Sequence, residues 1–167
     1  MVTWRLAAII LPVVGLAGLW GWSDYQSRQG TEWEVPIQGY DPRDLLRGHY
    51  VEFTYDWPGS DDWAADAVIP LEACLEGTPP GPPTLVQLNP GDACEYPVEA
   101  DFDGVYGESS LLRGRLYVGQ DRAAELEEKL LDPEYQGFVR IRLGTNRRIT
   151  PLDIRFERVD LAPAAEQ

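Results

Sequence analysis

The sequence predicts an α+β fold, with a mostly antiparallel β domain and one amphipathic helix, preceded by a single N-terminal transmembrane helix. Three observations support this prediction: an uncharged apolar run near the N-terminus, several short segments of alternating apolar and polar residues, and one later stretch with helical periodicity. The chain has 167 residues, of which 44% are apolar and 25% are charged. This composition is typical of one globular domain.

The N-terminal apolar run extends from Leu6 to Ser23 without a charged side chain. As a helix, these eighteen residues would be roughly 27 Å long, close to the thickness of the hydrocarbon layer of a membrane. Tryptophan rings favour the headgroup layer, and three of them flank the run: Trp4, Trp20 and Trp22. We therefore expect residues 4–22 to anchor the chain in the lipid bilayer.

The charges around this run predict its orientation. Arg5 and the amino terminus precede it, whereas the residues after it carry more acidic than basic side chains. By the positive-inside rule, the N-terminus of this single-pass protein lies in the cytoplasm and the C-terminal domain lies outside, in the periplasm. Two alternatives remain open: a signal peptide cleaved near residues 15–17, and a helix buried in a protein core. A cleaved signal peptide would also place the body of the chain outside the cytoplasm.

The next residues are interpreted as a polar juxtamembrane linker (residues 23–35), a folded domain (residues 36–160) and a flexible tail (residues 161–167). Asp41–Gly48 has the marks of a short helical turn, because Asp is a good N-cap and Gly often ends a helix. His49–Asp56 alternates between polar and apolar side chains, which is typical of a half-buried strand. Its predicted core face consists of Val51, Phe53 and Tyr55.

The two cysteines, Cys74 and Cys94, enclose a segment rich in Pro and Gly that we interpret as poor in regular structure. A disulfide between them would close a loop of about 20 residues and stabilise the fold by about 3 kcal/mol. Such a bridge would fit an exported protein. The alternative is a pair of unrelated thiols, and the spacing fits no zinc site. On either side, Ala67–Leu71 and Tyr96–Phe102 are predicted as short strands.

A second block of structure begins with a predicted strand at Gly114–Val118. Asp121 is a predicted N-cap for an amphipathic helix at Arg122–Leu131. Within this helix, Glu125 and Lys129 have the spacing of a favourable ion pair. The predicted apolar face consists of Ala123, Leu126 and Leu130.

The last predicted element is an antiparallel hairpin. Phe138–Leu143 and Ile149–Val159 alternate as strands, and residues 144–148 form the turn between them. Its predicted core residues are Val139, Ile141, Leu143, Leu152, Ile154 and Phe156.

The charge of the chain excludes some functions. Its formal net charge of −14 opposes binding to the phosphate backbone, so we predict no nucleic-acid partner. Residues 24–110 carry 18 acidic and 3 basic side chains, so nearly all the excess charge lies there. These acidic loops are either simply solvated or form a face for a basic partner or for cations. The stretch Asp101–Gly104 only faintly resembles a calcium loop.

The residues for catalysis are sparse. Ser109 and Ser110 lie about 60 residues from His49, the only histidine, and in no nucleophile-elbow context. Lys129 is the only lysine, and it already fits a pair on a helix surface. No nucleotide-binding motif or cluster of metal ligands is present. We therefore predict no cofactor and no metal site, and we expect binding rather than enzymatic activity.

The segment Leu45–Tyr55 resembles the signature of the GDYXXLXY family of small bacterial proteins with an N-terminal membrane anchor. Gly48, Tyr50 and Tyr55 match the signature, whereas His49 replaces its Asp and Phe53 replaces its Leu. The strand and helix of residues 114–127 and the closing hairpin are also similar. Together the resemblance covers most of residues 36–159.

The resemblance implies a small β-rich extracytoplasmic domain without an established activity, and a multi-pass membrane protein as its partner. Because His49 stands in place of the family's Asp, a role that needs a carboxylate there is not carried over. We predict a partner-binding patch on the polar side of the signature strand, consisting of Arg43, Arg47, His49, Tyr50 and Glu52. The alternatives are a small-ligand or cation-binding envelope domain and, third, an envelope hydrolase.

Overall fold

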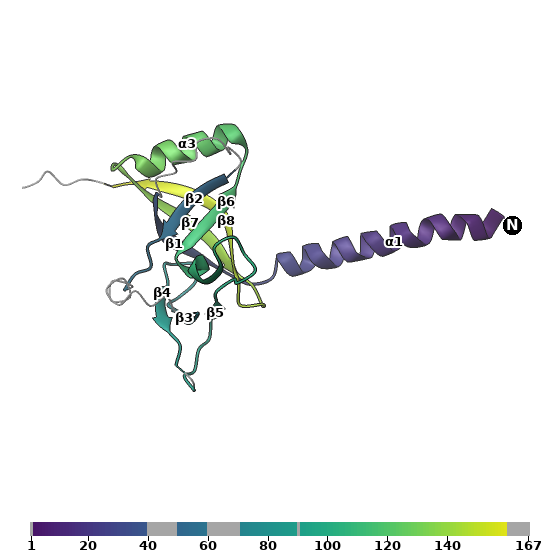
Figure 1. Ribbon diagram of the computed structural model, residues 1–167, viewed down its shortest axis with the longest axis horizontal. Helices are drawn as coiled ribbons and strands as arrows, with labels where there is room; N and C mark the ends of the chain where they lie inside the picture. The colour runs from purple at the N-terminus through teal and green to yellow at the C-terminus, as the bar shows by residue number, and fades with distance from the viewer. Residues whose placement is uncertain (1, 40–49, 60–70, 90, 160–167) are drawn as a thin grey trace, which may run out of the picture. The chain divides into compact units, whose positions relative to one another are not determined.

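The computed structural model describes residues 2–39, 50–59, 71–89 and 91–159 (Figure 1). Of residues 2–9, 124 and 127 it describes the backbone alone. The chain forms two compact units, Met1–Gly30 and Thr31–Gln167.

The first unit is a single helix, α1 (Val2–Ser27). It ends within the predicted linker, where Arg28 Nε lies 3.0 Å from Asp24 Oδ2. At about 100° per residue, its exposed apolar side chains are distributed all round the helix axis: Ile10, Leu11, Val13, Val14, Leu16 and Leu19. Within the described part of the chain, no helix is both long enough and apolar enough to cross a membrane.

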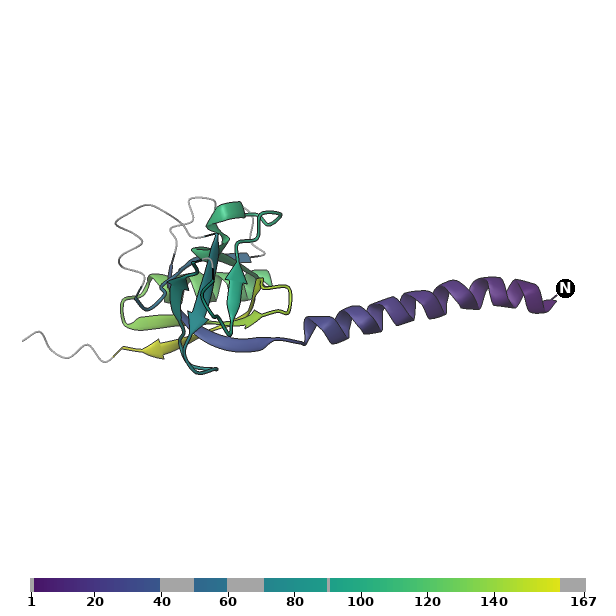
Figure 2. The same cartoon turned by 90° about the horizontal axis from the view of Figure 1, so that it is seen from below.

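The second unit is an α+β domain with two antiparallel sheets (Figures 1 and 2). The larger sheet has five strands in the order β6-β2-β1-β7-β8, and the smaller has three in the order β4-β3-β5. The larger sheet consists of β1 (Thr31–Gly39), β2 (Tyr50–Tyr55), β6 (Arg113–Tyr117), β7 (Tyr135–Leu143) and β8 (Ile149–Arg158). The other elements are β3 (Glu72–Glu76), β4 (Thr84–Gln87), β5 (Pro97–Glu99), the 3₁₀ helix η1 (Gly107–Leu111) and α3 (Gln120–Leu131).

Both sheets and α3 share one hydrophobic core. Helix α3 packs against β1, β2 and β7, and the edge strands β6 and β8 also contact each other, so the larger sheet is curled. The largest side chains with almost no exposure are Trp33, Trp57 and Phe53. Burial of this apolar surface is the main stabilising contribution to such a fold.

The strand predicted at the family signature is confirmed as β2. Its burial alternates as predicted, with Val51, Phe53 and Tyr55 in the core. The predicted strand near residue 114 is confirmed as β6, and it pairs with β2 so that Gly114 lies opposite Phe53. The signature strand therefore lies between β6 and β1 in the larger sheet.

The interpretation of residues 23–35 as a linker is wrong for its second half. Strand β1 begins at Thr31, and Trp33 and Val35 are fully buried. The alternating acidic residues made this segment resemble a solvated linker, but arginines on β7 and β8 pair with them. Arg142 Nη2 lies 2.5 Å from Glu32 Oε1, and Arg155 pairs with Glu34.

The predicted hairpin is confirmed as β7 and β8, with one correction to its core. A bulge shifts the register, so that Val139 pairs with Ile154 but Ile141 pairs with Pro151. Leu152 is the extra residue of the bulge and is only half-buried, contrary to the prediction. A bulge reverses the two-residue alternation, and the sequence pattern carried no sign of it.

The predicted helix is confirmed as α3, although its cap differs from the prediction. Gly119, rather than Asp121, is the N-cap residue, and Asp121 lies within the first turn. On the predicted apolar face, Ala123 and Leu126 are buried and Leu130 is partly buried against the core. The predicted ion pair also forms, because Lys129 Nζ lies 2.7 Å from Glu125 Oε1.

Cys74 in β3 forms a disulfide with Cys94, which lies between β4 and β5, and the Cα–Cα distance is 5.9 Å. The segment between the two cysteines was interpreted as irregular, which is wrong in part, because it contains β4 and the end of β3.

Of the predicted strand Tyr96–Phe102, only the three residues of β5 form a strand. Leu71 is exposed and precedes β3. The other predictions for residues 41–48, 67–70 and 161–167 lie outside the described residues.

Trp57 connects the end of the signature strand to η1. Its indole Nε1 donates a buried hydrogen bond of 2.6 Å to the carbonyl oxygen of Leu111, and its ring stacks on Tyr55.

Substitution of Trp57 by Phe should lower the free energy of unfolding by about 2 kcal/mol, because the carbonyl of Leu111 loses its partner and the smaller ring leaves a void. Urea unfolding would measure this loss. As a control, Tyr117→Phe at an exposed ring should change it by less than about 0.5 kcal/mol; equal effects would contradict the prediction.

Candidate functional site

The outer face of the signature strand carries a cluster centred on Arg115. The register of β2 and β6 places Tyr50 opposite Tyr117 and Glu52 opposite Arg115. Arg115 forms an ion pair with Glu52, and its guanidinium carbon lies 3.9 Å from the centroid of the Tyr50 ring. We call Tyr50, Glu52, Tyr106, Arg115 and Tyr117 the Arg115 cluster.

Two further tyrosines surround the guanidinium. Its carbon lies 5.6 Å from the ring centroid of Tyr106 and 6.0 Å from that of Tyr117. Nη1 of Arg115 also donates a weak hydrogen bond of 3.5 Å to the hydroxyl of Tyr117. Only 18% of the Arg115 side chain is exposed, so its interactions with aromatic rings and carboxylate are little screened by water. The cluster therefore holds the charged guanidinium of Arg115 in a fixed orientation at the β6 edge of the larger sheet.

Burial changes the acid–base properties of this region. Burial raises the pKa of Tyr106 to about 12, against a smaller lowering by Arg115. Burial also raises the pKa of Tyr55, with the neighbouring Tyr106 as a further cause. Burial lowers the pKa of Arg115, but hydrogen bonds to Tyr117, Glu52 and Tyr106 outweigh it and raise the pKa above its usual range. Both tyrosines are therefore neutral, and Arg115 is charged, at physiological pH.

The raised pKa of Tyr106 predicts a loss of stability in alkali. Because folding favours the protonated phenol, this contribution is fully present below the unfolded pKa near 10 and is lost as the pH rises through about 12. The urea midpoint should therefore fall between about pH 9 and about pH 11. Tyr106→Phe should make this fall shallower without abolishing it, because burial also raises the pKa of Tyr55. An unchanged slope in that variant would refute the assignment to Tyr106.

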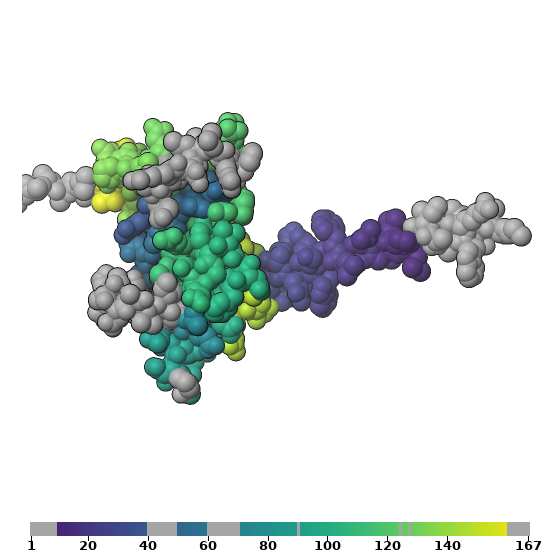
Figure 3. Space-filling model, in the orientation of Figure 1, coloured from purple at the N-terminus to yellow at the C-terminus, as the bar shows by residue number. Residues whose placement is uncertain are grey.

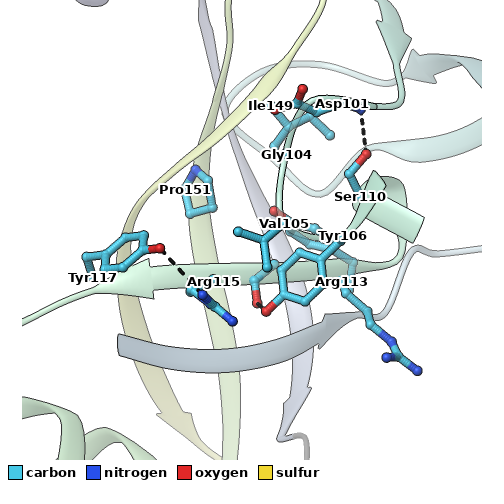
Figure 4. Close-up of a pocket in the computed structure, with 12 residues that line it drawn as sticks. Asp101, Gly104, Val105, Tyr106, Ser110, Arg113, Arg115, Tyr117, Ile149 and Pro151 are labelled. Carbon is cyan, nitrogen blue, oxygen red and sulfur yellow. Dashed lines mark hydrogen bonds between the residues drawn. The ribbon is translucent and has the colours of Figure 1, made fainter. Parts of the chain in front are cut away.

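A cavity of about 220 Å³ adjoins the Arg115 cluster. It lies between β6, the start of β8 and the segment 101–110 (Figure 4). Figure 3 shows the face of the domain on which the green surface around residues 100–115 lies. The lining residues are Tyr55, Asp101, Gly104, Val105, Tyr106, Ser110, Arg113, Gly114, Arg115, Tyr117, Ile149 and Pro151.

Hydrogen bonds and ion pairs hold the segment above the cavity. The backbone N–H of Asp101 donates to Ser110 Oγ over 2.6 Å. Arg148 lies 2.7 Å from Asp101 Oδ1 and 3.0 Å from Asp103 Oδ2. Asp101 and Asp103, the two acidic residues of the stretch that faintly resembles a calcium loop, are thus both paired with Arg148. Among the described residues, no three His, Cys, Asp or Glu side chains gather as a set of metal ligands.

The structure brings together part of the predicted site. Tyr50 and Glu52 both contact Arg115 on the outer face of β2, whereas Arg43, Arg47, Gly48 and His49 lie outside the described residues. The two signature tyrosines lie on opposite faces of β2. Tyr50 packs against Arg115 on the outer face, and Tyr55 lines the cavity from the core face. Phe53 is buried.

Three residues of the cluster were not predicted: Tyr106, Arg115 and Tyr117. The alternation of β6 could have placed Arg115 and Tyr117 on one polar face, but not opposite the signature strand. Tyr106 lies in an irregular segment, where no periodic pattern indicates which way a side chain points. Its position depends on contacts between segments distant in the sequence.

Comparison with known proteins supports the family resemblance. The sequence model described as "GDYXXLXY protein" matches residues 12–151. Searches of curated proteins and of solved structures found no match. Because the family match spans well over half of the chain and includes the strand that builds the Arg115 cluster, this chain belongs to the GDYXXLXY family.

Proposed function

We propose that this chain is a membrane-anchored, extracytoplasmic binding domain that acts as an accessory to a protein of the membrane or envelope. Residues 4–22 are the anchor, and the N-terminus lies in the cytoplasm. The unit beginning at Thr31 lies in the periplasm and contacts a multi-pass membrane protein through the Arg115 cluster. The predicted patch residues Arg43, Arg47 and His49 belong to the same proposal.

The anchor is supported by the uncharged run from Leu6 to Ser23. The structure describes side chains of this run from Ile10 onward, and their large apolar groups are exposed on every side of the helix. A helix that is apolar all round requires a nonpolar environment on all sides, which a bilayer supplies. The disulfide between Cys74 and Cys94 supports an oxidising compartment for the second unit.

The observation that carries the binding proposal is the fixed Arg115 guanidinium at the edge of the signature strand, 3.9 Å from the Tyr50 ring. Arg and Tyr are enriched among the residues that contribute most of the binding energy of protein interfaces. Here Glu52 and the surrounding tyrosines orient the arginine before any partner arrives. Such preorganisation lowers the entropic cost of association.

The binding proposal is tested by cross-linking the full chain in native membranes and purifying it under denaturing conditions. We expect one multi-pass membrane protein in stoichiometric amount. Tyr50→Ala should reduce its recovery at least about tenfold, because the ring that supports Arg115 is removed. Thr54→Ala, on the same strand and face, is the matched control and should retain recovery. Absence of a specific protein from the wild-type sample would contradict the proposal.

The topology is tested by fusing a reporter that is active only in the periplasm to Gln167. We expect the periplasmic reporter to be active, and we expect the chain to leave the membrane fraction only when detergent is added. Activity of a cytoplasmic reporter at the same position would contradict the orientation. Recovery of the intact chain in the soluble fraction without detergent would contradict the anchor.

A second candidate function is binding of a small ligand or cation by the envelope domain. The excess of acidic side chains in residues 24–110 favours a cation. Against this reading, Asp101 and Asp103 are already paired with Arg148. A rise in melting temperature with millimolar calcium, beyond that in an ionic-strength control, would favour the cation over the protein partner.

A further inference from the structure

The cavity beside the Arg115 cluster has the size of a site for a single ring. Its volume is about 220 Å³. A cavity of roughly 150 Å³ holds benzene, whereas sites for drug-sized ligands begin near 300 Å³. The volume of the cavity therefore matches one substituted aromatic ring and is less than the volume that a whole nucleotide or an extended cofactor would fill.

The charges around the cavity favour an uncharged occupant. Arg115 is paired with Glu52, and Asp101 is paired with Arg148. The side chain of Arg113 points away from Val105 and Tyr106 (Figure 4). An ionised group entering the cavity would lose hydration and would have to compete with ion pairs that already exist.

The lining of the cavity favours an aromatic occupant. Three tyrosines (Tyr55, Tyr106 and Tyr117) line it together with the aliphatic groups of Val105, Ile149 and Pro151. Aromatic rings pack well against one another in offset and edge-to-face arrangements, and a guanidinium such as that of Arg115 adds a cation–π interaction.

The rim of the cavity favours a macromolecule over a free small molecule. Val105 is 68% exposed, Tyr117 is 66% exposed, and Phe102, between the lining residues Asp101 and Gly104, is 55% exposed. A small molecule inside the cavity would leave this apolar rim in water. A protein that inserts one side chain would cover the rim as well, as in interfaces built around an aromatic anchor.

We propose that the cavity between β6, β8 and the segment 101–110 receives one uncharged aromatic side chain of the protein partner. This inference rests on the proposed binding function and specifies the chemistry of the partner's contact residue. The signature strand contributes to both parts of the surface, with Tyr50 supporting Arg115 and Tyr55 lining the cavity.

The test is a titration of the methyl-labelled full chain in lipid nanodiscs with N-acetyl-tryptophanamide, followed by NMR. We expect saturable shifts at the methyl groups of Ile149. Val105→Asp should weaken binding about tenfold, because it places a charge at the mouth of an apolar cavity. The matched control is Leu131→Asp, which adds the same charge at a similarly exposed apolar residue outside the lining and the rim, and it should bind within about twofold of wild type.

Tyr117→Thr provides a second variant, because threonine retains the strand preference of β6 and removes one wall of the cavity. It should also weaken binding. Unaltered methyl shifts in the wild type, or equal binding by wild type and both cavity variants, would overturn the inference.

Two further probes decide the nature of the occupant. N-acetyl-leucinamide should bind about fivefold more weakly than the tryptophan probe, and equal binding would exclude an aromatic preference. N-acetyl-tryptophan, which carries a carboxylate, should bind no more tightly than the amide; much tighter binding would indicate a free anion and overturn the inference. Because the titration needs no partner, its failure is distinguishable from failure of the cross-linking experiment.

Discussion

Replacement of Gly114 by Ala is expected to lower the free energy of unfolding by about 3 kcal/mol. A Cβ atom at this position would overlap Cε2 of Phe53 and would lie 2.9 Å from the hydroxyl oxygen of Tyr55. Both rings are buried in the core, so neither can move aside without disturbing its neighbours. The change is measured as the shift in the urea unfolding midpoint of the full chain.

The matched control is Gly119→Ser, which also adds a side chain to a glycine near β6. No heavy atom lies within 4 Å of a Cβ at Gly119, and serine is a favourable N-cap for α3. Its stability should be unchanged or slightly increased. Equal losses in the two variants would show that steric crowding against Phe53 and Tyr55 does not govern the effect.

Removal of the disulfide by the double substitution Cys74→Ser and Cys94→Ser should cost a similar amount, about 3 kcal/mol. The bridge closes a loop with a sequence separation of 20 residues and restricts the unfolded chain accordingly. The double variant and the wild type would be compared by urea unfolding with and without dithiothreitol. Reductant should destabilise the wild type and leave the variant unchanged; an unchanged wild type would refute the prediction.

The elements predicted well from the sequence are those with a clear local period. The alternation of Val51, Phe53 and Tyr55 predicted β2, and the spacing of Ala123, Leu126 and Leu130 predicted the buried face of α3. In these elements the burial of each side chain follows from its own segment, so neighbouring residues carry enough information.

The elements missed are those whose pairing decides their structure. Strand β1 looked like a linker because Glu32 and Glu34 alternate with its apolar residues, and only the arginines on β7 and β8 explain them. The bulge that displaces Leu152 arises from the register of two strands rather than from either alone. Such features depend on partners that a single segment cannot specify.

The sequence by itself determined the family, the apolar N-terminal run and which two cysteines are available to pair. Only the tertiary structure decided that Arg115 lies against Tyr50 and Glu52, and that a cavity forms where β6 meets β8 and the segment 101–110. The physical reason is strand register, because side chains face one another across antiparallel strands only after segments more than 60 residues apart have been aligned.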